Sequence, residues 1–313
     1  MSKAGIVEEL HRGARRNFPR RYVTIKGPND LYQMDLVEMI PYAGQNRGYK
    51  YLLTMIDTFS KRAWAVPLKQ KNMEETSKAL DNIFKGLKNP PKLLQADAGT
   101  EFFNRMVKAV LAKYGIKLYS SYSTLKASII ERFNRTLKTW MWKKFSLRGT
   151  YKWVDLLDSL LETYNNRVHR TIGVAPAKVS ESNEKTIHER LLASNRKMVS
   201  KVRQRKKPKF KVGDKVRISK FKHEFEKGYT PNWTAEVFTV DGVQRTLPVT
   251  YRLKGWRGDE IKGGFYEQEL QKTRYENTFL VEKVLRRKGN KAYVKWLGFD
   301  KTYNEWIDAK DFD

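Results

Sequence analysis

The sequence predicts an α/β core with a mixed five-stranded sheet and helices, followed by two small modules made of β-strands. Three observations predict this architecture. In residues 30–181, three apolar segments with short turns precede alternating helical and extended segments, and further helical segments follow. Residues 182–208 are polar and basic, which indicates a partly helical linker. From residue 209 onward, the apolar segments become short, and glycines occupy many of the turns between them.

Five extended segments are expected to form the core sheet. Residues 31–39, 49–57 and 63–68 are apolar with short turns between them, as in an antiparallel meander. Residues 92–97 and 116–119 alternate with segments whose apolar residues have helical spacing, at 73–87 and 103–114. Helices are also expected around Glu131 to about residue 145, over 153–168 and, briefly, over 176–179. This element order is that of an RNase H-like domain, in which the first and fourth strands lie side by side.

The composition points to a polyanionic partner. Lys and Arg number 63 against 34 Asp and Glu, which gives a formal net charge of +29. Nucleic acid is the usual partner of so basic a chain, and an anionic membrane is the rival. The sequence has no apolar run near 18 residues and no signal peptide, so we expect a soluble chain that is not secreted and has no membrane partner.

The ligand chemistry of any metal site is restricted by the absence of cysteine. With no cysteines, disulfides and thiolate-zinc sites are excluded, and only four scattered histidines remain. Carboxylates are therefore the expected ligands, and oxygen ligands suit Mg²⁺ or Mn²⁺.

Three carboxylates stand out as candidate ligands. Asp35 interrupts an apolar strand, where an unpaired charge is costly. Asp97 lies where the fourth strand should end, just before Gly99. Glu131 lies on a helix face away from the apolar stripe, together with Asn134, Arg135 and Lys138. If the first and fourth strands are neighbours and this helix crosses them, the three carboxylates converge.

The motifs around these residues resemble the Asp-Asp-Glu triad of retroviral-type integrases. The matching segments are Tyr32-Gln33-Met34-Asp35-Leu36, Ala96-Asp97-Ala98-Gly99-Thr100-Glu101-Phe102 and Glu131-Arg132-Phe133-Asn134-Arg135-Thr136-Leu137-Lys138. From 35 to 97 is 62 residues and from 97 to 131 is 34, a second spacing that fits the integrases of Polinton/Maverick DNA elements. Residues 164–176 and 15–20 add to this resemblance.

The resemblance implies an enzyme, a nucleotidyltransferase and endonuclease that uses two Mg²⁺ or Mn²⁺ ions per active site. Asp35 would bridge the two ions, while Asp97 and Glu131 would each hold one. Water would be the nucleophile when an element end is trimmed, and a DNA 3′-hydroxyl when that end is joined to target DNA. Asn134, Arg135 and Lys138 are expected to contact DNA near the scissile phosphate, although a solvated helix face explains them equally well. Integrases of this type work as homo-oligomers, typically tetramers.

The two C-terminal modules also resemble known domains. Residues 209–273 resemble the Src-homology-3-like barrel that follows integrase cores, and Lys215 and Arg217 are expected to contact DNA there. Residues 274–313 resemble a chromodomain, in which Phe279, Trp296 and Phe299 would form the aromatic cage for methylated lysine. A methylated histone tail would then be a partner, added as a strand. The alternative is that these aromatics are only the core of a very small domain.

Two basic segments leave alternatives open. Residues 1–29 are read as a basic N-terminal arm, either solvated or DNA-binding. The basic run 203–208 is either a nuclear localisation signal, which would place the protein in the nucleus, or a solvated linker. Two rival functions also remain. One is the integrase of a gypsy-type chromodomain retrotransposon. It is disfavoured because the sequence has no cysteines for the N-terminal His/Cys zinc module of retroviral integrases. The other is a domesticated, non-catalytic chromatin- or DNA-binding protein.

Overall fold

The computed structural model describes residues 3–15, 17–20, 25–120, 127–203, 207–220 and 229–308, with only the backbone for 194–203. They belong to two compact units, each described here by itself. One unit, which we call the core unit, spans residues 23–198. The other, the terminal unit, combines residues 1–22 with residues 199–313. Four basic residues of the segments 1–29 and 203–208 lie outside the described residues: Arg16, Arg21, Arg205 and Lys206.

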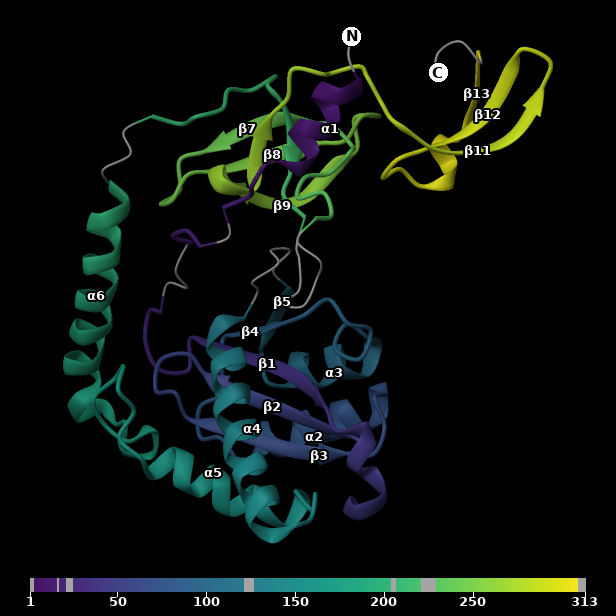
Figure 1. Cartoon of the computed structure of the whole chain (residues 1–313). Coiled ribbons are helices and arrows are strands. Elements are labelled where there is room, and N and C mark those ends of the chain that lie inside the picture. Colours follow the sequence, from purple (N-terminus) through teal and green to yellow (C-terminus); the bar gives the residue numbers. More distant parts are fainter. Residues whose placement is uncertain are drawn as a thin grey trace. The chain divides into compact units, whose positions relative to one another are not determined.

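The core unit is built on a five-stranded mixed sheet (Figure 1). Its strands are β1 (Leu31–Glu38), β2 (Tyr51–Asp57), β3 (Ala63–Leu68), β4 (Leu93–Ala96) and β5 (Lys117–Ser120). The order across the sheet is β3-β2-β1-β4-β5, with β1 antiparallel to β2 and parallel to β4. The expected strands and the expected neighbours β1 and β4 are thereby confirmed.

Helices cover both faces of this sheet. On one face, α2 (Met73–Lys85) and α3 (Arg105–Lys113) pack with Met34, Leu53 and Met55 of the strands. On the other face, α4 (Ser128–Arg148) and α5 (Leu157–Asn166) pack with Leu52 and Ile56. Adjacent residues of β2 thus point to opposite layers, as strand geometry requires. The unit therefore has three layers, with a hydrophobic core on each side of the sheet.

Short helical turns and one long helix complete the core unit. The turns are η1 (Ile40–Asn46), η2 (Val154–Leu156) and η3 (Pro176–Lys178). Where the sequence predicted a partly helical linker, the structure has a single helix, α6 (Glu181–Arg203). Ile187 and Leu191 of α6 are buried against Phe59 and Ile172, so the start of this segment belongs to the core unit.

The terminal unit contains two separate sheets. The first is antiparallel, with order β10-β6-β7-β8-β9: β6 (Lys215–Ile218), β7 (Phe238–Gln244), β8 (Thr250–Lys254), β9 (Glu260–Tyr266) and β10 (Leu270–Lys272), with η4 (Glu267–Glu269) before β10. The second contains β11 (Val281–Lys288), β12 (Lys291–Trp296) and β13 (Glu305–Asp308), with η5 (Lys301–Tyr303) before β13. The resemblance of these two sheets to Src-homology-3-like barrels and chromodomains remains a prediction.

The N-terminal segment belongs to the terminal unit because it packs on the first sheet. Residues 3–11 of the expected basic arm form a helix, α1 (Lys3–His11), whose Ile6 and Leu10 are buried with Trp233. Gly5 lies so close to the Tyr275 hydroxyl that no side chain would fit there. The backbone carbonyl of Leu10 accepts hydrogen bonds from the amides of Asn232 and Trp233, at 2.8 and 3.2 Å.

A buried ion pair anchors α1. The Glu9 carboxylate lies 3.6 Å from the Arg217 guanidinium, and the side chains are 8% and 0% exposed respectively. Glu9 Oε2 also accepts a 2.7 Å hydrogen bond from the Thr273 hydroxyl. Arg217 Nη1 donates to the carbonyls of Thr234 and Ala235. The N-terminal helix is thus held to β6 by a charge pair removed from water.

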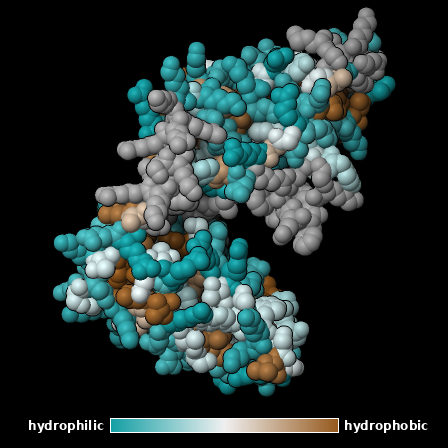
Figure 2. All heavy atoms as spheres, turned by 60° about the vertical axis from the view of Figure 1, so that its left-hand side comes forward, coloured by the Kyte–Doolittle hydropathy of each residue, from teal (hydrophilic) through white to brown (hydrophobic). Residues whose placement is uncertain are grey.

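The surface is mainly polar. On the face shown in Figure 2, hydrophilic side chains predominate and the hydrophobic ones form separate patches on each unit. Within the described part of the chain, no helix has the length and apolar character needed to cross a membrane.

Replacement of Glu9 tests the role of the buried pair. Glu9→Gln leaves the Arg217 charge buried without its counter-charge, so we expect the terminal unit to lose about 3–5 kcal/mol of unfolding free energy. Hydrogen exchange of β6–β10 amides as a function of denaturant measures this loss unit by unit. Glu8→Gln, on the exposed side of α1, is the matched control and should change little. Equal protection in the two variants would contradict the assignment.

Candidate active site

The carboxylates predicted to form a metal site lie on three elements that one buried side chain connects. Gln33 of β1 is fully buried, and its Nε2 donates a 2.9 Å hydrogen bond to Gln95 Oε1 of β4. Its Oε1 accepts a 3.0 Å hydrogen bond from the backbone amide of Ile130 in α4. Ile130 is the third residue of α4, where the side chain of the N-cap residue usually accepts this bond. The N-cap here is Ala127, which cannot do so, and Gln33 takes its place.

This arrangement sets the position of Asp35 and Asp97. The parallel register pairs Gln33 with Gln95, so two residues further along each strand Asp35 and Asp97 follow at the same level. Because side chains alternate along a strand, each aspartate also shares the face of its glutamine. Asp97 comes just after the end of β4 and is exposed, while Asp35 is partly buried within β1.

The pKa of Asp35 is affected by burial and by neighbouring carboxylates. Burial raises the pKa of Asp35, and the charges of Asp97 and Glu101 raise it further. Two hydrogen bonds lower the pKa again: the Leu36 amide donates to Asp35 Oδ1 at 2.8 Å, and Asn134 Nδ2 donates to Oδ2 at 2.9 Å. Asp35 and Asp97 are therefore close enough to repel one another when both are ionised.

Glu101 is held by a different partner. Its carboxylate forms a 3.1 Å ion pair with Lys71 Nζ and is only 8% exposed. The side chain folds back over Gly99, so a side chain at position 99 would displace this carboxylate. The glycine expected to allow a sharp exit from the strand therefore also makes room for this carboxylate.

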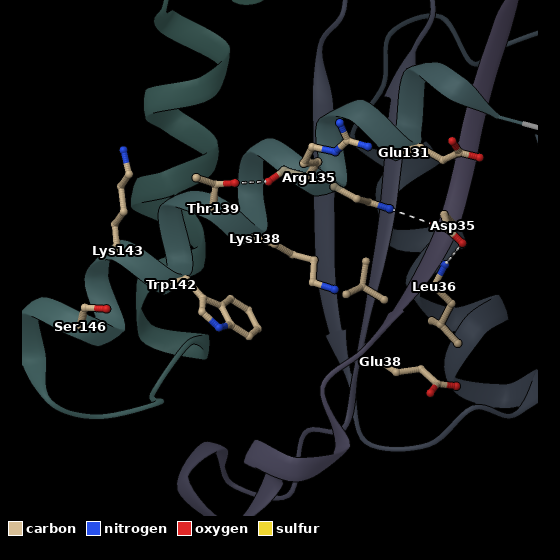
Figure 3. Close-up of a pocket in the computed structure, with 12 residues that line it drawn as sticks. Asp35, Leu36, Glu38, Glu131, Arg135, Lys138, Thr139, Trp142, Lys143 and Ser146 are labelled. Carbon is tan, nitrogen blue, oxygen red and sulfur yellow. Dashed lines mark hydrogen bonds between the residues drawn. The ribbon is translucent and has the colours of Figure 1, made fainter. Parts of the chain in front are cut away.

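Glu131 reaches the same region from α4. It lies in the first turn of the helix and, with Asp35, lines an open groove with a volume of about 860 Å³. Figure 3 shows the two carboxylates on adjoining elements, α4 and β1. Arg135 and Lys138 line the groove further along α4, and both are exposed.

Asn134 is placed differently from the prediction. It was expected on the DNA-contacting face with Arg135 and Lys138, yet it is only 6% exposed because its side chain turns toward β1 and donates to Asp35. Its Oδ1 is also buried and has no hydrogen-bond partner within the described residues. Asn134 thus orients Asp35 and offers one oxygen to a donor that enters the site.

The donor set fits a hard divalent cation. Asp35, Asp97 and Glu131 supply only carboxylate oxygens, which Mg²⁺ and Mn²⁺ prefer. The buried, unpaired Asn134 Oδ1 beside Asp35 could accept a hydrogen bond from a metal-bound water. Over the part of the chain that the structure describes, however, no three acidic or histidine side chains already stand at metal-binding separation.

Comparison with known proteins agrees with this geometry. Residues 26–122 match the family model of the integrase core domain. This segment is therefore similar to integrase core domains. It includes Asp35 and Asp97 and ends before α4, so the match does not extend to Glu131.

Relatives exist among transposon-derived and retroviral proteins. An uncharacterised transposon-derived protein of Caenorhabditis elegans is 38% identical over 200 residues, covering 64% of this chain and 65% of that protein. The Pol polyprotein of Radiation murine leukemia virus (strain Kaplan) is 34% identical over 149 residues, covering 46% of this chain and 25% of the polyprotein. The chain thus spans less than two thirds of the length of either relative.

A solved structure shares the fold over most of the chain. It is a chain of the simian T-cell lymphotropic virus intasome, solved in complex with PP2A regulatory subunit B56 gamma. The similarity covers 83% of each chain with a TM-score of 0.53 and 17% sequence identity. This likeness agrees with an integrase-type RNase H-like core in residues 23–198.

The basic residues expected to bind DNA in the terminal unit are not equivalent. Arg217 is fully buried and paired with Glu9, so the prediction that it contacts DNA is wrong. Lys215, two residues earlier on β6, is partly exposed and its Nζ donates a 2.8 Å hydrogen bond to the Thr239 hydroxyl. Alternation along the strand does not explain the difference, because residues two apart share one face. Arg217 differs in having Glu9 of α1 packed against it.

The three aromatics of the expected cage lie together. The Phe279 ring centroid is 6.0 Å from that of Trp296 and 5.3 Å from that of Phe299. The Trp256 ring, from the turn between β8 and β9, packs edge-on against Phe279 at 5.1 Å. Rings this close fill much of the space between them, which is the arrangement of a small core. Whether they also receive a methylated lysine stays a prediction.

The Gln33 connection can be tested through a double-mutant cycle. Gln33→Leu removes the acceptor of the Ile130 amide and the donor to Gln95 Oε1, so we expect a loss of about 1–3 kcal/mol in unfolding free energy. Hydrogen exchange of the Ile130 amide should accelerate. Gln95→Leu in addition should cost less than the sum of the single changes, because a buried apolar pair needs no partner. Additive losses would show that the two glutamines do not act as one unit.

Proposed function

We propose that the chain is a DNA integrase that processes the 3′ ends of a mobile element and joins them to target DNA. The observation that carries the proposal is that Asp35 and Asp97 lie at the same level on neighbouring strands. The Gln33 side chain hydrogen-bonds both to the second of these strands and to the helix that bears Glu131. The match of residues 26–122 to the integrase core domain supports it.

The residues of the site have different roles in the proposed phosphoryl transfer. Asp35, Asp97 and Glu131 would hold the divalent ions, and Asn134 would keep the Asp35 carboxylate oriented. Bound ions would activate the attacking oxygen and stabilise the leaving one. Arg135 and Lys138, exposed in the groove, would neutralise the phosphates on either side of the scissile bond. In each step one P–O bond forms to water or to a 3′-hydroxyl, and the P–O bond opposite to it breaks.

We further assign the enzyme to a Polinton/Maverick-like element. The spacing of 34 residues from Asp97 to Glu131 favours this type over a gypsy-type retrotransposon. Function on chromatin would place it in the nucleus. The aromatic cluster of Phe279, Trp296 and Phe299 is the candidate contact to a methylated histone tail. Because the related viral chain belongs to an intasome, we propose a homo-oligomer, a tetramer, on DNA ends.

The catalytic assignment predicts a shared defect. Asp35→Asn, Asp97→Asn and Glu131→Gln should each lower DNA joining by more than about 100-fold. Mutation of a residue that only supports a metal ligand already costs up to about 100-fold, and loss of a ligand itself should cost more. Joining of a labelled duplex pool with randomised ends into a plasmid, with Mg²⁺ or Mn²⁺, measures it. Asp81→Asn, at a surface ion pair on α2 with Lys113, is the control and should keep full activity.

Retention of joining by Asp97→Asn would refute the enzyme assignment. Absence of joining in the wild type, together with absence of divalent-metal binding, would favour the non-catalytic DNA- or chromatin-binding alternative.

The groove cations predict a change in salt dependence. Each phosphate contact contributes a slope of about −0.9 to log K against log salt, so Lys138→Gln should make the slope shallower by about 1. Binding of fluorescent duplex DNA at several salt concentrations measures it. Lys144→Gln is the matched control, since Lys144 is exposed on the same helix outside the groove. Equal slopes in the two variants would place the DNA elsewhere.

A further inference from the structure

The groove that holds Asp35 and Glu131 continues well past the proposed catalytic residues. It follows α4 to Ser146 and runs between this helix and the end of β1, where Val37 and Glu38 form the opposite wall. From Glu131 to Trp142 is eleven helical residues, which span roughly 16 Å at 1.5 Å per residue. One strand of a duplex advances about 3.4 Å per nucleotide. The groove is therefore long enough for several nucleotides beyond the scissile phosphate.

Trp142 forms an aromatic surface in this groove. Its side chain is 37% exposed and points to the same side of α4 as Lys138 (Figure 3). Lys138 Nζ lies 5.9 Å from the centre of the indole ring. The ring also packs against Tyr42, edge-on at 5.7 Å, and Phe145, at 5.2 Å. An aromatic side chain packed in this way is pre-organised to receive a flat partner.

The charge around Trp142 identifies the kind of partner. Arg135 and Lys138 lie between Trp142 and the carboxylates, and burying both cations under an apolar protein face would be costly. Aromatic rings interleaved with cations are typical of sites for single-stranded nucleic acid, where bases stack and phosphates are neutralised. Within a duplex, each base face is already covered by its neighbours. An unpaired base, unlike a base pair inside a duplex, presents a free face to this ring.

We propose that Trp142 stacks on an unpaired base of the DNA strand that runs along α4 away from the catalytic carboxylates. The site thereby favours DNA with a single-stranded extension over a blunt duplex. This inference rests on the proposed integrase function and adds a determinant of substrate structure to it.

Binding of labelled DNA by the full chain tests the inference. Duplexes that are blunt, or that carry a short 5′ or 3′ single-stranded extension, are compared by fluorescence anisotropy. Because one stacked base is lost, Trp142→Leu should weaken binding of an extended duplex by about tenfold. Affinity for the blunt duplex should not change. Trp142→Phe, which keeps an aromatic face, should retain most of the preference.

The control is Leu147→Ala on the same helix, because Leu147 is 78% exposed and lies outside the groove. It should bind all three duplexes as the wild type does. In the wild type, photo-crosslinking of an extension that contains 5-iodouracil should label Trp142, which keeps the test valid if Trp142→Leu fails to fold.

Three outcomes would overturn the inference. They are an equal loss of affinity for blunt and extended duplexes, a crosslink elsewhere, and a change of oligomeric state in Trp142→Leu, which would mark a protein interface. The proposed function fails separately, through joining activity that survives Asp97→Asn. An active enzyme without any extension preference would therefore refute only the role of Trp142.

Discussion

The hydrogen bonds of the buried Gln33 side chain keep the three carboxylate-bearing elements in one fixed arrangement. Its amide donates to Gln95 on β4 and its carbonyl accepts from the Ile130 amide of α4. Both bonds are buried, where an unmade hydrogen bond is far costlier than in water. A slip of β4 or a shift of α4 would break at least one of them. The position of Asp97 relative to Asp35, and of Glu131 relative to both, follows from this constraint.

A second buried constraint, in the terminal unit, explains why the basic composition is not uniformly available to DNA. In a chain with a formal charge of +29, the Arg217 guanidinium would seem a natural phosphate contact. It is instead neutralised by Glu9, and α1 removes both from solvent. The charge that remains exposed at the proposed catalytic site is concentrated on α4, at Arg135 and Lys138. Electrostatic attraction of DNA thus depends on where cations are left unburied.

Much of the core could be predicted from the sequence, since apolar periodicity and glycine punctuation mark elements locally. Strand order and the adjacency of Asp35 and Asp97 followed from the order of those elements. The burial of Asn134 could not be predicted in this way, because helical spacing places it at the border between the apolar stripe and the groove. Its side chain is buried because it donates a hydrogen bond to Asp35 of β1. Gln33 was missed for a similar reason. Its one signal is its position two residues before Asp35, repeated by Gln95 before Asp97.

The same reasoning separates two kinds of residue on α4. Asn134 acts inward, because its buried amide has Asp35 as its partner and an unpaired oxygen beside it. Trp142, two turns further on, acts outward, because its ring packs against Tyr42 and Phe145 and is still 37% exposed in the groove. A helix that only covered a sheet would need no exposed indole beside a lysine. Its presence in the groove of the carboxylates is therefore better explained by a ligand that is both flat and anionic.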